Sequence, residues 1–162
     1  MRCSDLNLSK NMESLEYMQM IEVHSTLELI PSDDMQAIAI ELMGNGFNSK
    51  SLLALAILDK SDVHEASALL KKALAELGCR GIKIVDALRL YAKSIAKSII
   101  AGEMSPQDGA TRIWRTKTNA HLPDFHEFDG FIYAASELED RPEDREIFES
   151  GILAEARSLL SL

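Results

Sequence analysis

Signals that start and stop helices recur along this chain, whereas the alternating apolar and polar pattern of strands is nearly absent. In residues 102–108, Gly102 suits the left-handed end of one helix, and Ser105 with Pro106 suits the start of the next. The preceding segment 82–101 carries apolar residues at helical spacing: Ile84, Leu88, Tyr91 and Ile95. This pattern restricts the chain to folds in which helices pack on helices.

The same signals predict seven or eight helices joined by short connections. We expect helices at about residues 9–29, 32–44, 50–58, 61–78, 82–101, 106–117, 127–138 and 142–160. No connection is long enough to mark a domain boundary, and 162 residues suit one domain. The sequence therefore predicts an all-α, compact single-domain bundle over residues 9–162, preceded by a disordered N-terminal tail at residues 1–8.

Acidic and basic residues occupy separate parts of the chain. Residues 1–79 contain 12 acidic and 6 basic side chains, and residues 80–121 contain 3 acidic and 8 basic ones. Residues 122–162 contain 11 acidic and 3 basic side chains. The formal net charge is −9. A negative field repels polyanions and attracts cations. Nucleic acid and anionic membranes are therefore poor candidates as partners, and a basic protein is a better one.

The C-terminal acidic run contains only Arg141 and Arg145 as internal cations. Its members are Glu137, Glu139, Asp140, Glu143, Asp144, Glu146 and Glu149. The positive end of the last helix dipole explains Glu143, Asp144 and Glu146, but not the remaining acids. One interpretation is a solvated helix face. The other is a partner-binding surface, for which we select Glu139, Asp140, Glu143, Asp144 and Glu146.

A cluster of imidazoles and carboxylates at residues 121–129 suggests an alternative function. His121, Asp124, His126 and Glu127 have the side-chain types that bind zinc, iron or manganese, so the alternative is a metal-binding protein or metal-dependent enzyme. Their spacing matches no established metal motif. A structural interpretation is also open, in which Asp124 caps a helix and Glu127 completes a capping box. We expect no cofactor.

A basic stripe lies at helical spacing in the segment 82–101. Arg89, Lys93 and Lys97 are four residues apart, so they share one helix face. The phosphate-binding loops or interleaved aromatic residues of nucleic-acid sites are missing beside them. These cations either face the acidic last third of the chain or are solvated.

Other features point to a cytoplasmic protein without an evident catalytic motif. Cys3 and Cys79 are too few for a disulfide framework and lack metal-site spacing. We find no secretory signal pattern and no apolar run long enough to span a bilayer. No serine or cysteine sits in a nucleophile motif, so an enzyme is the less favoured hypothesis. The Met-rich N-terminal helix offers a third hypothesis, a homo-oligomeric scaffold.

One segment carries a family resemblance. Residues 102–114, Gly-Glu-Met-Ser-Pro-Gln-Asp-Gly-Ala-Thr-Arg-Ile-Trp, resemble a segment of small acidic all-helical bacterial proteins of uncharacterised families. In those proteins the segment also follows a long helix and precedes an acidic C-terminal helix, and some of them resemble immunity proteins that neutralise a toxin. The resemblance implies a non-enzymatic bacterial protein of the immunity or antitoxin type. It transfers no functional residue.

Overall fold

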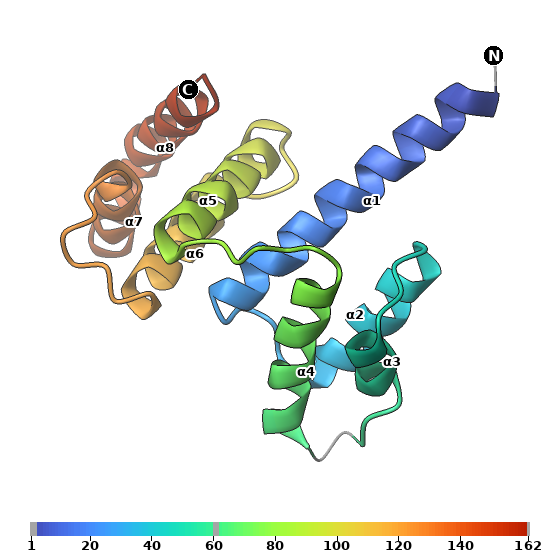
Figure 1. Ribbon diagram of the computed structural model, residues 1–162. Helices are drawn as coiled ribbons and strands as arrows, with labels where there is room; N and C mark the ends of the chain where they lie inside the picture. Colours follow the sequence, from blue (N-terminus) through green and yellow to red (C-terminus); the bar gives the residue numbers. More distant parts are fainter. Residues whose placement is uncertain (1–2, 60–61, 162) are drawn as a thin grey trace. The chain divides into compact units, whose positions relative to one another are not determined.

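The protein is built from helices. The computed structural model describes residues 3–59 and 62–161, with side chains from residue 13 onward except that of residue 63. This part of the chain contains eight α-helices and one 3-10 helix and no strand, which confirms the predicted all-α class (Figure 1). The elements are α1 (Cys3–Thr26), α2 (Ser32–Gly44), α3 (Lys50–Ala56), α4 (Val63–Glu76), α5 (Ile84–Ile100), α6 (Pro106–Asn119), α7 (Asp129–Asp140), η1 (Pro142–Asp144) and α8 (Arg145–Leu160). Among these helices, none combines the length and apolar character needed to cross a membrane.

Contacts within the chain define two compact units, residues 1–83 and residues 84–162. The sequence predicts one domain over residues 9–162, because no connection is long enough to reveal a boundary. Association of the two units as one domain stays a prediction. The first helix begins at Cys3, inside the segment 1–8 that the sequence assigns to a tail.

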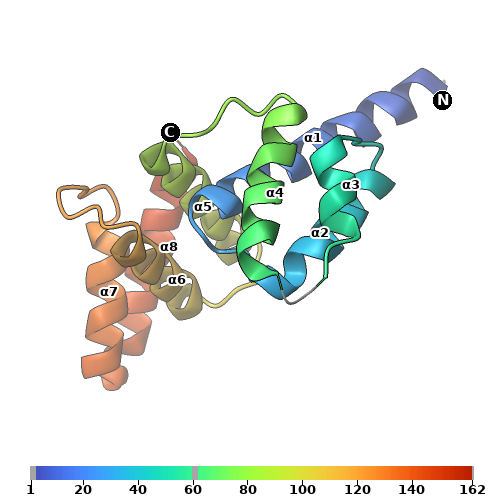
Figure 2. The same cartoon turned by 60° about the horizontal axis from the view of Figure 1, so that its bottom comes forward.

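In the first unit, α2, α3 and α4 pack against one another and α1 contacts α4 (Figure 2). The core is mostly aliphatic and consists of Ile21, Met35, Ala39, Leu42, Leu52, Leu55, Ala66, Leu70, Ala73 and Leu74. The carboxylate of Glu76, at the end of α4, accepts hydrogen bonds from the backbone N–H and the hydroxyl of Ser51, at 3.0 and 2.8 Å. One helix therefore stabilises the first turn of another.

In the second unit, α5 packs against α6 and α8, and α7 contacts both α6 and α8. The predicted apolar face of α5 is confirmed for Leu88, Tyr91 and Ile95, which are buried. Ile84 lies at the helix start and is 38% exposed. Large side chains from the other helices are fully buried in the same unit, namely Ile113, Phe131 and Ile152.

The predicted break between α5 and α6 is confirmed in detail. Gly102 has a φ of 75°, the left-handed conformation that ends a helix at low steric cost. The hydroxyl oxygen of Ser105 then accepts a hydrogen bond from the N–H of Asp108 at 3.1 Å. Pro106 occupies the first turn of α6, where its missing N–H costs little.

The start of α7 differs from the capping box that the sequence suggests. This helix begins at Asp129, two residues later than predicted, and no side chain caps it. Asp124 is therefore too far upstream to act as its cap, and Glu127 instead binds Arg89. Phe128, which directly precedes α7, is buried at 1% exposure.

Candidate functional site

The five predicted partner-binding residues come together at the junction of α7 and α8. Glu139 and Asp140 end α7, Glu143 and Asp144 form the 3-10 turn, and Glu146 lies in the first turn of α8. We call these five residues the acidic surface. All are exposed except Asp144, which is half-buried. Their short separation along the chain gathers five carboxylates at one end of the α7–α8 pair.

Nearby arginines neutralise other acids more than they neutralise this surface. Arg141 forms an ion pair with Glu137, and Arg145 pairs with Glu149 at 3.2 Å. Arg141 also approaches Asp144, at 4.0 Å. Within the described part of the chain, no cation forms an ion pair with the remaining four acids: Glu139, Asp140, Glu143 and Glu146.

Local helix stability explains only part of the acidic surface. Glu143 and Glu146 lie near the start of α8, where the positive end of the helix dipole favours acids. Glu139 and Asp140 lie at the C-terminal end of α7, where the helix dipole is negative and the last turn contains no basic residue. An acid there costs a helix about 0.3–1 kcal/mol. These two carboxylates therefore weaken the helix that carries them.

Exposed apolar side chains lie on the same two helices. Tyr133 of α7 is 60% exposed and Ile147 of α8 is 68% exposed. The ring of Tyr133 meets Phe148 edge-on, with centroids 6.3 Å apart, and the Arg141 guanidinium lies 5.2 Å from the Phe148 ring centre. Sequence alone does not identify Tyr133 as a surface residue, because helical spacing does not show which apolar side chains escape burial.

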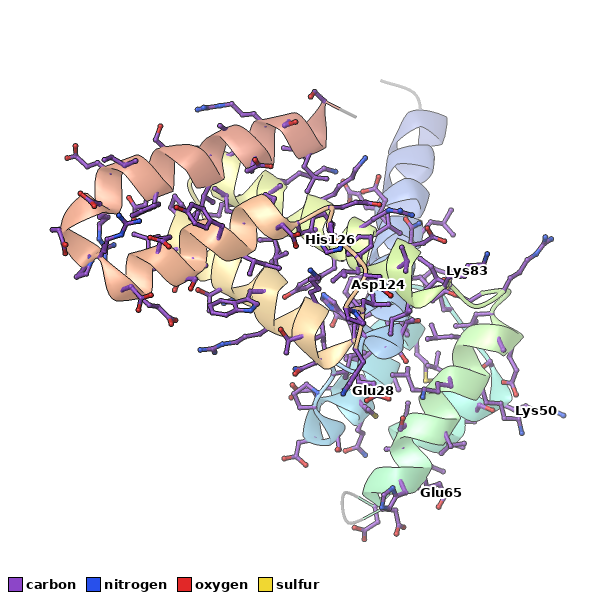
Figure 3. The ribbon with its side chains drawn as sticks, turned by 90° about the vertical axis from the view of Figure 1, so that its left-hand side faces the viewer. Glu28, Lys50, Glu65, Lys83, Asp124 and His126 are labelled. Carbon is purple, nitrogen blue, oxygen red and sulfur yellow. The ribbon has the colours of Figure 1, made fainter. Side chains whose placement is uncertain are left out.

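Three of the four residues of the metal hypothesis contact other partners. Glu127 accepts a hydrogen bond from Arg89 Nε at 2.8 Å, and this contact with a cation lowers the pKa of its carboxyl group. The imidazole of His126 lies 2.8 Å from Asp129, and His121 contacts the carbonyl of Asn119. Figure 3 shows His126 and Asp124 on the connector before α7. Across the described residues, no group of three or more His, Cys, Asp or Glu side chains is arranged to hold a metal ion.

The predicted basic stripe is not neutralised by the acidic surface. Arg89 pairs with Asp86 and Glu127, which lie on its own helix and on the connector. Lys93 is half-buried and Lys97 is exposed, and neither forms an ion pair within the described part of the chain. Arg89, Lys93 and Lys97 therefore form no ion pair with the acidic surface among the described residues.

Comparisons with models of protein families, with curated proteins and with solved structures return no match. The resemblance of residues 102–114 to small acidic bacterial proteins therefore stays a prediction.

Proposed function

We propose that this chain is a non-enzymatic bacterial protein of the immunity or antitoxin type. It binds a basic protein through the acidic surface and blocks the active site of that partner. The observation that carries the proposal is the exposure of Glu139, Asp140, Glu143 and Glu146 without an ion pair among the described residues. Uncompensated charge of one sign attracts a partner of the opposite sign and accelerates encounter.

The position of Glu139 and Asp140 supports a role beyond folding. Both residues sit where the dipole of α7 disfavours acids, and neither gains an ion pair there among the described residues. Side chains that lower local stability without a compensating contact are typical of binding surfaces. A cation on the partner would give Glu139 and Asp140 the ion pairs that α7 itself does not provide.

Tyr133 and Ile147 give the proposed surface apolar contact area. Interfaces combine apolar anchors, among which tyrosine is enriched, with a polar rim. Both anchors lie on α7 and α8, the helices that carry the acids. In this arrangement the carboxylates attract and orient the partner, while Tyr133 and Ile147 provide apolar surface that becomes buried in the complex.

Capture of partners from cells of the native organism tests the proposal. The wild-type protein is compared with a variant carrying Glu139→Gln, Asp140→Asn, Glu143→Gln and Glu146→Gln, here named the α7–α8 variant. A control variant neutralises four exposed acids of the first unit: Glu13, Glu16, Glu28 and Glu65. Both variants change the net charge by the same amount, so the comparison separates a local surface from overall charge.

We expect one basic protein to be retained by the wild-type and control proteins at low salt and lost with the α7–α8 variant. High salt should weaken its retention, because exposed charges are screened. The proposal also requires that the captured protein lose its own activity in the complex. An acidic partner, or equal losses with both variants, would contradict it.

A further inference from the structure

The second unit contains a pocket that the proposed function does not use. Its volume is about 540 Å³, and it is formed by α6, α7 and the connector between them. Pockets that bind small molecules have volumes of about 300–1,000 Å³ and mostly apolar walls with a few polar groups. The apolar wall here consists of Trp114, Leu122, Pro123 and Ile132.

A lysine and an aspartate supply the charged groups of this pocket. Lys117 Nζ lies 2.9 Å from Asp129 Oδ1, and the lysine side chain is only 13% exposed. The other oxygen of Asp129 lies 2.8 Å from His126 Nδ1. Lys117 and His126 lower the pKa of the Asp129 carboxyl group, so this carboxylate stays ionised and is already paired with two basic groups.

The polar groups still available to a ligand are mainly donors. An ammonium group has three N–H bonds, and Asp129 accepts only one from Lys117. The indole N–H of Trp114 has no acceptor among the described residues, whereas His121 donates its Nδ1–H to the Asn119 carbonyl and therefore offers Nε2 only as an acceptor. The start of α7, at Asp129, adds the positive end of a helix dipole. An anionic ligand rich in acceptors complements this set.

We propose that this pocket binds a small monocarboxylic acid with an apolar body. The carboxylate accepts hydrogen bonds from Lys117 Nζ, and the apolar body packs against Trp114, Leu122 and Ile132. Asp129 holds the lysine in place when the pocket is empty, so the ligand adds a second anion to a partly buried cation. This proposal does not depend on the protein-binding function, because it uses the opposite end of α7 from the acidic surface.

The emission of Trp114, the only tryptophan of the chain, reports binding directly. Octanoate serves as the probe because it is optically silent, and octylamine and 1-octanol are matched ligands with a positive and a neutral head group. We expect octanoate to change the emission of Trp114 in a saturable way. It should bind about tenfold or more tightly than octylamine or 1-octanol, because a hydrogen bond to a charged group contributes enough free energy for such a ratio. Failure of octanoate to saturate, or equal binding of octylamine, would overturn the proposal.

Two substitutions identify the groups that hold the carboxylate. Lys117→Met should weaken octanoate binding about tenfold or more while leaving 1-octanol binding unchanged. Asp129→Asn should strengthen octanoate binding, because it removes a competing anion. Lys97→Met, which removes an exposed lysine outside the pocket, is the matched control.

Circular dichroism of each variant verifies that the helices are retained. Equal weakening by Lys97→Met would show a general charge effect and overturn the assignment to Lys117. Weaker octanoate binding in Asp129→Asn would show that Asp129 does not compete with the ligand for Lys117, and this result would also overturn the proposal. Neither result bears on the acidic surface, so the two proposals fail separately.

Discussion

Arg89 on α5 and Glu127 on the connector before α7 form an ion pair, with Arg89 Nε 2.8 Å from Glu127 Oε2. The same guanidinium pairs with Asp86 at 3.0 Å and lies 5.7 Å from the ring centre of Phe125. Arg89 thus joins the connector to α5. Because Glu127 is paired with Arg89, it is not available to the predicted metal cluster. Arg89 also forms no ion pair with the acidic surface.

The ion pairs around the connector predict a loss of stability in acid. Contacts with Arg89 lower the pKa of Glu127, and contacts with Lys117 and His126 lower that of Asp129. Because the folded-state pKa lies below the unfolded value, the stabilisation is present above about pH 4 and is lost as the pH falls through the folded-state pKa. Thermal unfolding monitored by Trp114 emission between pH 6 and pH 2.5 measures this loss.

The double substitution Glu127→Gln with Asp129→Asn provides the comparison for that measurement. We expect the wild-type protein to lose its stability advantage over the double variant as the pH falls below about 4. An advantage that stays constant across this range would contradict the role given to the two carboxylates.

Substitution of Ile147 separates binding from folding. Ile147→Ser should leave the free energy of unfolding within about 0.5 kcal/mol of wild type, because the side chain is 68% exposed. It should accelerate dissociation of the captured basic partner, since loss of an apolar anchor acts mainly on the dissociation rate. Surface plasmon resonance measures that rate. Ile57→Ser in the first unit, 77% exposed, is the control, and an equal effect there would exclude Ile147 from the interface.

Two helical glycines should respond in opposite directions to alanine. A Cβ at Gly109 would overlap the buried Ile99 side chain, whose Cγ1 would lie 2.8 Å away, and would approach Ile95 at 3.1 Å. Overpacking of this kind costs about 1–3 kcal/mol, so Gly109→Ala should destabilise the second unit. At Gly151 no atom lies within 4 Å, and alanine should stabilise α8 by about 1 kcal/mol.

Urea unfolding followed by Trp114 emission measures both changes, because this tryptophan lies in the second unit. A more stable Gly109→Ala protein would contradict the close packing of α6 on α5.

Local sequence signals were sufficient to predict most helix boundaries. Gly102, Ser105 and Pro106 act within a few residues of one another, so their effect is visible without tertiary structure. The cap of α3 is equally local, since Ser49 accepts a hydrogen bond from the N–H of Leu52 at 3.1 Å. Such contacts depend on the backbone close by, which sequence spacing describes well.

The contacts that define the candidate sites are less local. Arg89 and Glu127 are 38 residues apart, and Lys117 and Asp129 are 12 apart, so their pairing depends on how helices pack. The sequence could therefore suggest a metal cluster around Glu127 without showing that a distant arginine binds it. The exposure of Tyr133 was missed for the same reason. Charge segregation, in contrast, required no packing information.

The association rate constant of the captured basic partner tests the central claim most directly. It is measured by stopped flow at several salt concentrations for the wild-type protein, the α7–α8 variant and the control variant of the first unit. The account predicts a decrease of about tenfold or more at low salt for the α7–α8 variant, a decrease that diminishes as salt rises, and a rate near wild type for the control. An α7–α8 variant that associates as fast as the wild-type protein at low salt would contradict the claim that the acidic surface recognises the partner.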